Sequence, residues 1–245
     1  LGLAAVLVAA AVLPWALLAL RGGDPAPEAR APTRFAIPFP DDVRPATQLG
    51  GLAVSPDGRT IAFGASNDVS IRVFARDLGS VELRELYRDE YLRDVSFSPD
   101  GRWIGFRSGT RMRKMPLAGG APVAFGPPGE EPAFTWLEGG GIVVEGPWGT
   151  GLRHMADERA EPVLLTRVDA EAGERAHSLA RALPGGRGVV FNVWTGRSWD
   201  KSRIGAAAIG SAGHRLVGVE GSSPVVVSTP AGDVLLWSRG GTIWA

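Results

Sequence analysis

The side chains that could carry chemistry are few and widely spaced in this sequence. There is no cysteine, so thiolate catalysis, thiolate metal sites and disulfide bonds are excluded. The three histidines, His154, His177 and His214, stand far apart, and none belongs to a His-Glu-x-x-His motif. Neither Gly-x-Ser-x-Gly nor a Walker phosphate loop occurs. The sequence therefore predicts no catalytic residue, no cofactor and no metal site.

Two kinds of isolated polar residue remain after this search. His177 stands in "ERAHSLARALPGG", and we interpret it as a polar residue near the start of a strand. Adjacent carboxylates could act as a general acid and base, and they occur at Asp41 and Asp42 and again at Glu130 and Glu131. Each pair lies beside proline or glycine, which favours a solvated loop over acid–base chemistry.

Binding chemistry is indicated most clearly in "NVWTGRSWDKSR" (192–203), which lengthens one predicted hairpin. Exposed aromatic rings beside charged groups are typical of recognition surfaces. The residues predicted to form a partner surface are Trp194, Arg197, Trp199, Asp200 and Lys201. If the chain binds a partner, this stretch is the first place to look, although the sequence does not name the ligand.

A second charged stretch, "RSGTRMRKM" (107–115), groups four cations, Arg107, Arg111, Arg113 and Lys114. Strand alternation would place Arg111 and Arg113 on one face and Met112 on the other. Such a stripe could meet an anionic lipid or polymer, but a solvated outer strand face is the interpretation we favour. Over the whole chain 26 basic residues balance 26 acidic ones, so no nucleic-acid partner is predicted.

These candidate residues must be positioned by a framework, which begins with an apolar stretch. Residues 1–20 contain no charged side chain, and a helix of this length spans about 30 Å, the thickness of a bilayer core. We predict a single transmembrane helix, because the basic start and cleavage site of a signal peptide are not evident. A spacer rich in proline and glycine follows at 21–33 and leads to a folded region at 34–245.

The folded region repeats one turn. "VSPDGRTIAF" (54–63) reappears as "FSPDGRWIGF" (97–106), and proline, aspartate and glycine in this order favour a type I hairpin turn with glycine at positive φ. Degenerate copies follow at "LPGGRGVVF" and "TPAGDVLLW". The predicted turn residues are Ser55, Pro56, Asp57, Gly58, Ser98, Pro99, Asp100, Gly101, Gly186 and Gly232.

The turns recur about every 40–45 residues, with four strand-like runs in each period. This pattern predicts an all-β propeller of four-stranded blades. The expected blades are 51–90, 91–129, 130–168 and 175–220, with a partial blade at 222–245.

A propeller closes by joining its first and last blades. The stretch "RFAIPFP" (34–40) is a suitable closing strand, but six blades at this period would need roughly 260 residues. We therefore expect part of a six-bladed propeller: four complete blades, an incomplete fifth, and the strand at 34–40 without its partners.

The phrases "SPDGRTIAF" and "SPDGRWIGF" resemble the blades of TolB-like, WD-repeat-like β-propellers. The longer phrases "KMPLAGGAPV", "LPGGRGVVFNVWTG" and "RGGTIWA" are similar to the extracytoplasmic propeller of bacterial transmembrane serine/threonine-protein kinases. The resemblance implies a sensor propeller that residues 1–20 anchor in the cytoplasmic membrane, with the kinase domain preceding Leu1. Two alternatives stay open, a periplasmic TolB-like interaction scaffold and the propeller of a hydrolase.

Overall fold

The computed structural model describes residues 36–37, 39–45, 52–67, 69–128 and 133–245. The chain divides into two units, Leu1–Pro38 and Phe39–Ala245, and the second is described below. The predicted transmembrane helix at 1–20 and spacer at 21–33 lie outside the described residues and stay predictions. Within the described ranges, no helix combines the length and apolar character needed to cross a bilayer.

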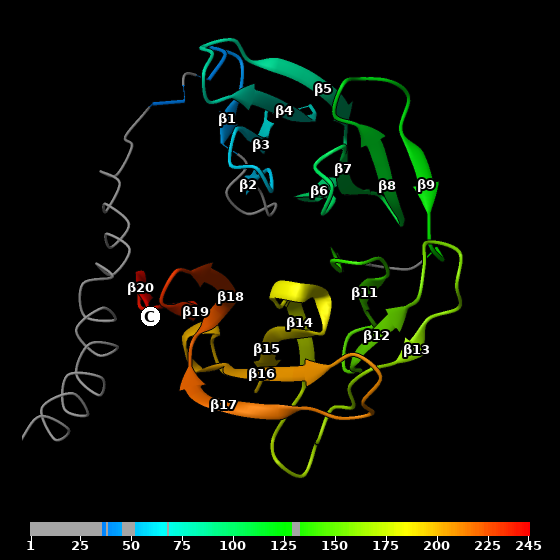
Figure 1. The fold of residues 1–245 in the computed structure, drawn as a ribbon, viewed down its shortest axis with the longest axis vertical. Coiled ribbons are helices and arrows are strands. Elements are labelled where there is room, and N and C mark those ends of the chain that lie inside the picture. Colours follow the sequence, from blue (N-terminus) through cyan, green and yellow to red (C-terminus); the bar gives the residue numbers. More distant parts are fainter. Residues whose placement is uncertain (1–35, 38, 46–51, 68, 129–132) are drawn as a thin grey trace, which may run out of the picture. The chain divides into compact units, whose positions relative to one another are not determined.

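The second unit consists of five antiparallel sheets (Figure 1). The first contains β1 (Arg44–Pro45), β2 (Leu52–Val54), β3 (Thr60–Ser66), β4 (Ile71–Asp77) and β5 (Arg84–Asp89). The second contains β6 (Leu92–Phe97), β7 (Trp103–Ser108), β8 (Arg111–Pro116) and β9 (Val123–Phe125). The third contains β10 (Phe134–Trp136), β11 (Ile142–Glu145), β12 (Leu152–Met155) and β13 (Val163–Leu164). The fourth contains β14 (Ala176–Ala182), β15 (Gly188–Trp194), β16 (Arg203–Ala208) and β17 (Arg215–Glu220), with short 3₁₀ helices η1 (Pro184–Gly186) and η2 (Trp199–Lys201) in its connections. The fifth contains β18 (Ser222–Thr229), β19 (Gly232–Arg239) and β20 (Thr242–Trp244).

The sheets follow one another around a common axis in chain order, and each is a blade (Figure 1). The inner strands of the five blades are β2, β6, β10, β14 and β18. Contacts between successive inner strands join β2 to β6, β6 to β10, β10 to β14 and β14 to β18. The all-β propeller predicted from the sequence is confirmed, with five blades visible.

The second, third and fourth blades have the predicted four strands, and the fifth is incomplete, as predicted. The fifth blade has three strands, and the first has an additional short strand, β1. Because β2 pairs only with Ile61–Phe63 of the longer β3, the far end of that edge stays open, and β1 pairs there with Ala65 and Ser66. The sequence predicted a closing strand at 34–40, but none of the described residues in that range lies in a strand. The added strand β1 lies further along the chain, at Arg44–Pro45.

Each SPDG turn is held by its own side chains. In the first, Gly58 N donates to Ser55 O (2.8 Å), Ser55 Oγ donates to Asp57 Oδ1 (2.5 Å), and Thr60 N donates to Ser55 Oγ (2.9 Å). The second turn, Ser98–Trp103, makes the same bonds. The turn glycines have φ values of 70° and 69°, which side chains other than glycine rarely adopt. These hydrogen bonds and the positive φ require serine, aspartate and glycine at fixed positions, which explains why the same residues recur in both turns.

Much of the core lies between blades, where buried apolar side chains of adjacent sheets meet. Ile61 and Phe63 are 2% and 3% exposed, and their equivalents Ile104 and Phe106 are fully buried. Three apolar clusters fill the spaces between the first and second, second and third, and third and fourth blades. Each blade therefore depends on its neighbour to cover its faces.

Candidate functional site

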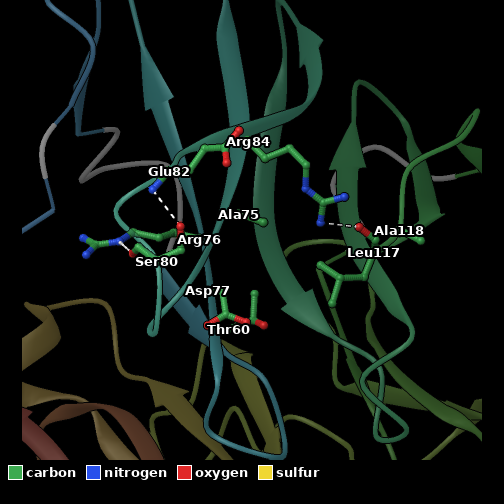
Figure 2. Close-up of a pocket in the computed structure, with 9 residues that line it drawn as sticks. All are labelled: Thr60, Ala75, Arg76, Asp77, Ser80, Glu82, Arg84, Leu117 and Ala118. Carbon is green, nitrogen blue, oxygen red and sulfur yellow. Dashed lines mark hydrogen bonds between the residues drawn. The ribbon is translucent and has the colours of Figure 1, made fainter.

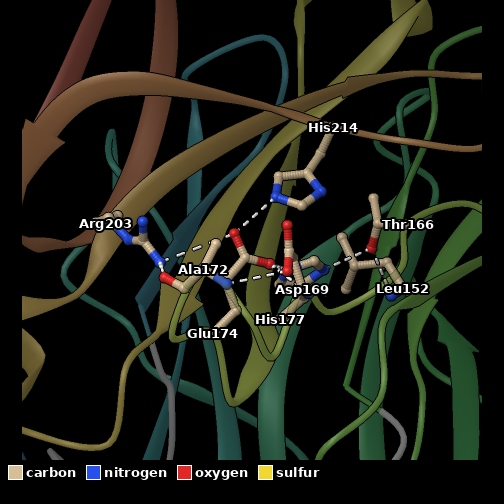
Figure 3. Close-up of polar contacts among 8 residues, drawn as sticks. All are labelled: Leu152, Thr166, Asp169, Ala172, Glu174, His177, Arg203 and His214. Atoms are coloured by element: carbon tan, nitrogen blue, oxygen red, sulfur yellow. Dashed lines mark hydrogen bonds and ion pairs between the residues drawn. The ribbon is translucent and has the colours of Figure 1, made fainter.

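A buried polar cluster lies where the third blade meets the fourth. It consists of Glu174, in the connection between β13 and β14, His177, on β14, and His214, just before β17 (Figure 3). Their side chains are 2%, 0% and 11% exposed, respectively. We call these three residues the Glu174 cluster.

The carboxylate of Glu174 holds the cluster together. Its Oε2 lies 3.0 Å from His177 Nε2, and its Oε1 lies 3.0 Å from His214 Nε2. The backbone N–H of Asp169 also donates to Oε2, at 2.9 Å. Arg203 Nη2 lies 3.9 Å from Oε1 and donates to the carbonyl of Ala172 at 2.9 Å (Figure 3). A buried carboxylate is thus surrounded by donors, as its charge requires.

The other ring nitrogen of His177 reaches the third blade. His177 Nδ1 lies 2.7 Å from Thr166 Oγ1, which accepts a hydrogen bond from the backbone N–H of Leu152 at 2.9 Å. Thr166 is fully buried, and so is Leu152 on β12. A continuous chain of polar contacts therefore runs from β12 through Thr166 and His177 to Glu174.

The protonation states follow from these contacts. Burial acts to raise the pKa of Glu174, but the Asp169 N–H and the two imidazoles outweigh it and hold the pKa below its usual value. Burial lowers the pKa of His177, although the Glu174 carboxylate opposes the change. At neutral pH the network consists of a carboxylate and a neutral His177, whose Nε2–H faces Glu174 while the Thr166 hydroxyl donates to Nδ1.

Thr166, His177 and Glu174 stand in the order of a nucleophile, a base and an orienting carboxylate. Hydrolysis would require a substrate carbonyl to reach Thr166 Oγ1. That residue is 0% exposed, and its oxygen is already occupied by Leu152 N–H and His177. The arrangement therefore stabilises the contact between two blades and does not offer a nucleophile.

The interpretation of His177 as a polar residue near a strand start is confirmed, but the sequence did not indicate its bonding partners. His177 does lie at the start of β14, but it is buried and bonded on both ring nitrogens. The spacing of Glu174 and His177 in "ERAH" was a local signal for part of the cluster. His214 approaches only because β15 and β16 bring the chain back, which the sequence does not reveal. His154 lies apart from the cluster, on β12.

The predicted partner surface lies at the end of the fourth blade. Trp194 ends β15 and Trp199 begins η2, and their rings are 4.7 Å apart. Trp148, from the turn between β11 and β12, brings a third ring to within 6.5 Å of Trp194. Trp148 and Trp199 are 69% and 45% exposed. We call Trp148, Trp194 and Trp199 the tryptophan face.

A pocket of about 440 Å³ lies beside this face. It is lined by Ala172, Gly173, Arg175, Thr195, Arg197, Lys201, Arg203 and Glu220. The lining contains four cations and one carboxylate, and Glu220 is shared between Lys201 and Arg239, each 3.4 Å away. We call it the cationic pocket.

Among the five residues predicted for the partner surface, the structure brings the two tryptophans together and places Arg197 and Lys201 in the pocket lining. Asp200 has a different position, because its Oδ1 accepts a hydrogen bond from Gly240 N, at 2.9 Å. It ties the loop to the fifth blade. The sequence did not indicate Trp148 or Arg175, which come from other turns.

A second pocket, of about 550 Å³, lies between the first two blades (Figure 2). Its cations are bound by backbone carbonyls: Arg76 Nε donates to Ser80 O at 2.7 Å, and Arg84 Nη2 donates to Leu117 O at 2.6 Å. Figure 2 shows that the Arg84 bond joins the first blade to the turn after β8 in the second, whereas the Arg76 bond lies within the first blade. We interpret this pocket as a structural contact between blades.

The basic stretch at 107–115 is largely engaged within the fold. Arg111 is exposed and Met112 fully buried, as strand alternation requires. Lys114 Nζ, however, bonds Glu158 Oε1 at 2.5 Å, which joins the second and third blades.

The structure describes only one of the two pairs of adjacent carboxylates. Asp41 and Asp42 are exposed, and Asp42 bonds the buried Arg72 of β4. Glu130 and Glu131 lie outside the described residues.

Comparison with solved structures identifies the architecture. The chain superposes on TolB from Acinetobacter baumannii with a TM-score of 0.51 at 18% identity, covering 68% of this chain and 45% of that one. For a putative TolB from Agrobacterium tumefaciens the TM-score is 0.57 at 14% identity, with 79% and 71% covered. This chain has the fold of a TolB-like β-propeller. Hydrazine synthase from Kuenenia stuttgartiensis also matches, with a TM-score of 0.54 at 17% identity and coverage of 82% and 59%.

The TolB-like resemblance predicted from the sequence is thus confirmed at the level of the fold. No protein-family model and no curated protein matches the chain. The chain spans less than half of the Acinetobacter protein's length, and identities below 20% do not transfer a function from one propeller to another.

Proposed function

We propose that the chain is a binding propeller rather than an enzyme, and that the tryptophan face and cationic pocket of the fourth blade form its recognition surface. The observation that carries this proposal is the convergence of Trp148, Trp194 and Trp199 from two blades, beside four cations. Aromatic rings and arginines contribute most strongly to binding when they lie together at an exposed surface. The buried position of Thr166 argues against hydrolysis at the Glu174 cluster.

The chemistry of this surface favours a ligand that carries both a ring and negative charge. Indole rings stack against flat apolar faces, and arginine binds carboxylate or phosphate groups with paired hydrogen bonds. Arg203 Nε is buried and has no hydrogen-bond partner among the described residues, so an anion near it would satisfy a free donor. An acidic carbohydrate combines the required features.

Fluorescence titration of the full chain tests this surface. We expect saturable binding of oligogalacturonate, which has acidic sugar rings, and none of a neutral galactose oligomer. Trp199→Ala and Arg197→Gln should each weaken binding about 10-fold, the effect of losing ~1.4 kcal/mol. Trp244→Ala and Arg111→Gln, at exposed positions on other blades, are the matched controls. Equal affinity in all four variants would contradict the proposed surface, and equal binding of the neutral oligomer would contradict the ligand class.

We further propose that residues 1–20 anchor this propeller in the cytoplasmic membrane and hold it outside the cytoplasm, as the sensor of a serine/threonine-protein kinase. The support is the apolar character of 1–20 and the resemblance of the blade sequences to those of such kinases. Ligand binding on the rigid propeller would then alter how the membrane helices associate.

Two measurements separate this proposal from its alternatives. A phosphatase reporter fused after Ala245 should be active if the propeller is extracytoplasmic, and inactive if it faces the cytoplasm. The coding sequence around this chain should contain a kinase before Leu1. A Ser-His-Asp domain after Ala245 would instead favour the propeller of a hydrolase, and neither domain would favour a TolB-like scaffold.

A further inference from the structure

The Glu174 cluster contains a donor set that the proposed function does not use. It brings two imidazole nitrogens and a carboxylate oxygen within 4.8 Å of one another. Two histidines and one glutamate are a common protein ligand set for zinc, which binds nitrogen and oxygen at about 2.0–2.2 Å. We propose that Glu174, His177 and His214 form a binding site for a divalent transition metal ion, with Zn²⁺ as the best fit. This proposal does not depend on the proposed function.

The first support is the direction of the ring nitrogens. The Nε2 atoms of His177 and His214 point toward the same carboxylate, each 3.0 Å from one of its oxygens (Figure 3). A metal ion placed among them would replace these two hydrogen bonds with three coordinate bonds. Because the side chains of Glu174 and His177 are 2% and 0% exposed, most of the ordering that binding requires is already present in the fold.

The second support is the outer partner of His177. A histidine that binds a metal through one nitrogen almost always donates its other N–H to an oxygen, which fixes the ring. Thr166 Oγ1 already lies 2.7 Å from His177 Nδ1 and is held by Leu152 N–H. Binding through Nε2 moves the ring hydrogen to Nδ1, and the Thr166 oxygen becomes its acceptor. The ring stays neutral, so this step releases no net proton.

The third support is the unequal freedom of the three ligands. Tetrahedral ligands around zinc lie about 3.3 Å apart. The two nitrogen–oxygen separations of 3.0 Å must therefore widen slightly, and the most widely separated ligand atoms, which lie within 4.8 Å, must approach one another. Glu174 and His177 are fixed by Asp169 N–H and Thr166, whereas His214 follows Gly213 in the turn before β17. His214 is also the most exposed of the three, at 11% of its side chain. It can therefore close on the ion and leave a fourth position for water.

Arg203 opposes the ion and gives the proposal a distinctive test. Its Nη2 lies 3.9 Å from Glu174 Oε1, so its charge repels a dication at the cluster. Removing that charge should strengthen metal binding, whereas a cluster that serves only to join two blades would gain no metal affinity. Arg203→Met keeps much of the apolar stem and removes the guanidinium.

The experiment is titration of the chelator-treated full chain with ZnCl₂ by calorimetry, and with CoCl₂ by visible absorption. We expect one zinc ion per chain and cobalt bands of a tetrahedral or five-coordinate site. His214→Gln and Thr166→Val should weaken binding about 10- to 100-fold, and Arg203→Met should strengthen it. His154→Gln, which removes a histidine outside the cluster, should bind as the parent does.

Several outcomes would overturn the site. They are no binding at micromolar zinc, a His214→Gln variant that binds like the parent, or a loss in His154→Gln equal to that in His214→Gln. Circular dichroism and thermal unfolding of every variant identify those that have lost the fold. Because the His214 side chain is partly exposed, we expect His214→Gln to keep the fold. Its zinc affinity therefore tests the site even if His177→Gln or Glu174→Gln fails to fold.

Discussion

The backbone N–H of Leu179, on β14, donates a hydrogen bond to the carboxyl group of Glu145, at the end of β11. This bond joins the third and fourth blades at a strained position. Leu179 has φ of 52°, in the left-handed region, and lies in a bulge between Ser178 and Arg181. The bulge turns its N–H away from the β14–β15 ladder and toward Glu145. A carboxyl group in the neighbouring blade thus stabilises an irregular strand.

The pKa of Glu145 leads to a pH prediction. Burial raises it from 4.5 to about 7, the Leu179 N–H opposes the rise, and the nearby Asp94 carboxylate adds to it. Between these values the folded chain holds a proton that the unfolded chain has lost, so the free energy of unfolding should fall as pH rises from 4.5 to 7. The full difference corresponds to at most ~3 kcal/mol.

Chemical denaturation at several pH values across this window measures the effect. Glu145→Gln cannot ionise and still offers an oxygen to Leu179 N–H, so its unfolding free energy should vary less with pH than that of the parent. Equal pH dependence in the two proteins would show that another group is responsible.

A second prediction concerns the turn glycines. Gly101 has φ of 69°, and a β-branched residue there is strained, so Gly101→Val should lower the free energy of unfolding by ~2–3 kcal/mol. Gly101→Asn should cost less, because asparagine tolerates the left-handed region. Thermal and urea unfolding give the comparison. If valine and asparagine have the same small effect, the positive φ does not matter to stability.

The close packing of Gly151 against the backbone of Thr166 supports a third prediction. A Cβ on Gly151 would collide with the carbonyl of Thr166, whereas a Cβ on Gly213 would meet no atom within 4 Å. Gly151→Ala should therefore lower the free energy of unfolding by at least ~1–3 kcal/mol, whereas Gly213→Ala should change it little. Urea unfolding of both variants makes the test. A mild Gly151→Ala would mean that the strand end before Thr166 can move aside.

A fourth prediction follows from the buried Thr166. The full chain should not hydrolyse ester or peptide substrates, because no substrate can reach the Thr166 oxygen in the folded state. It should also bind no ATP, since its sequence has no phosphate loop. Chromogenic ester assays and calorimetry with ATP are the measurements. Turnover that disappears in Thr166→Val without loss of structure would show that the triad-like contacts are catalytic.

The fold could be predicted from the sequence because each blade repeats local chemistry. Ser55, Asp57 and Gly58 form their turn with hydrogen bonds that span only six residues. The buried residues Ile61 and Phe63 alternate with their neighbours, and this local pattern is enough to predict a strand. The extra pairing of β1 was not foreseen, since it depends on the unequal lengths of β2 and β3.

The candidate site was predicted only where it is local. Trp194 and Trp199 lie five residues apart and were identified together, whereas Trp148 joins them from the preceding blade. His214 meets His177 after two further strands have reversed the chain, with ring centroids 4.6 Å apart. Side chains that meet across several reversals leave no periodic signal in a single sequence.

The pairing of consecutive strands has a consequence for how this chain is made. Within each blade, consecutive strands pair through short connections, and each apolar cluster needs only the next blade for completion. A ribosome that adds residues at about 5–20 per second releases each hairpin long before the following blade exists. Early blades can pair their strands at once but must wait, with one apolar face uncovered, for the next blade to emerge. The interval between blades is therefore the period when the nascent chain most needs protection from aggregation.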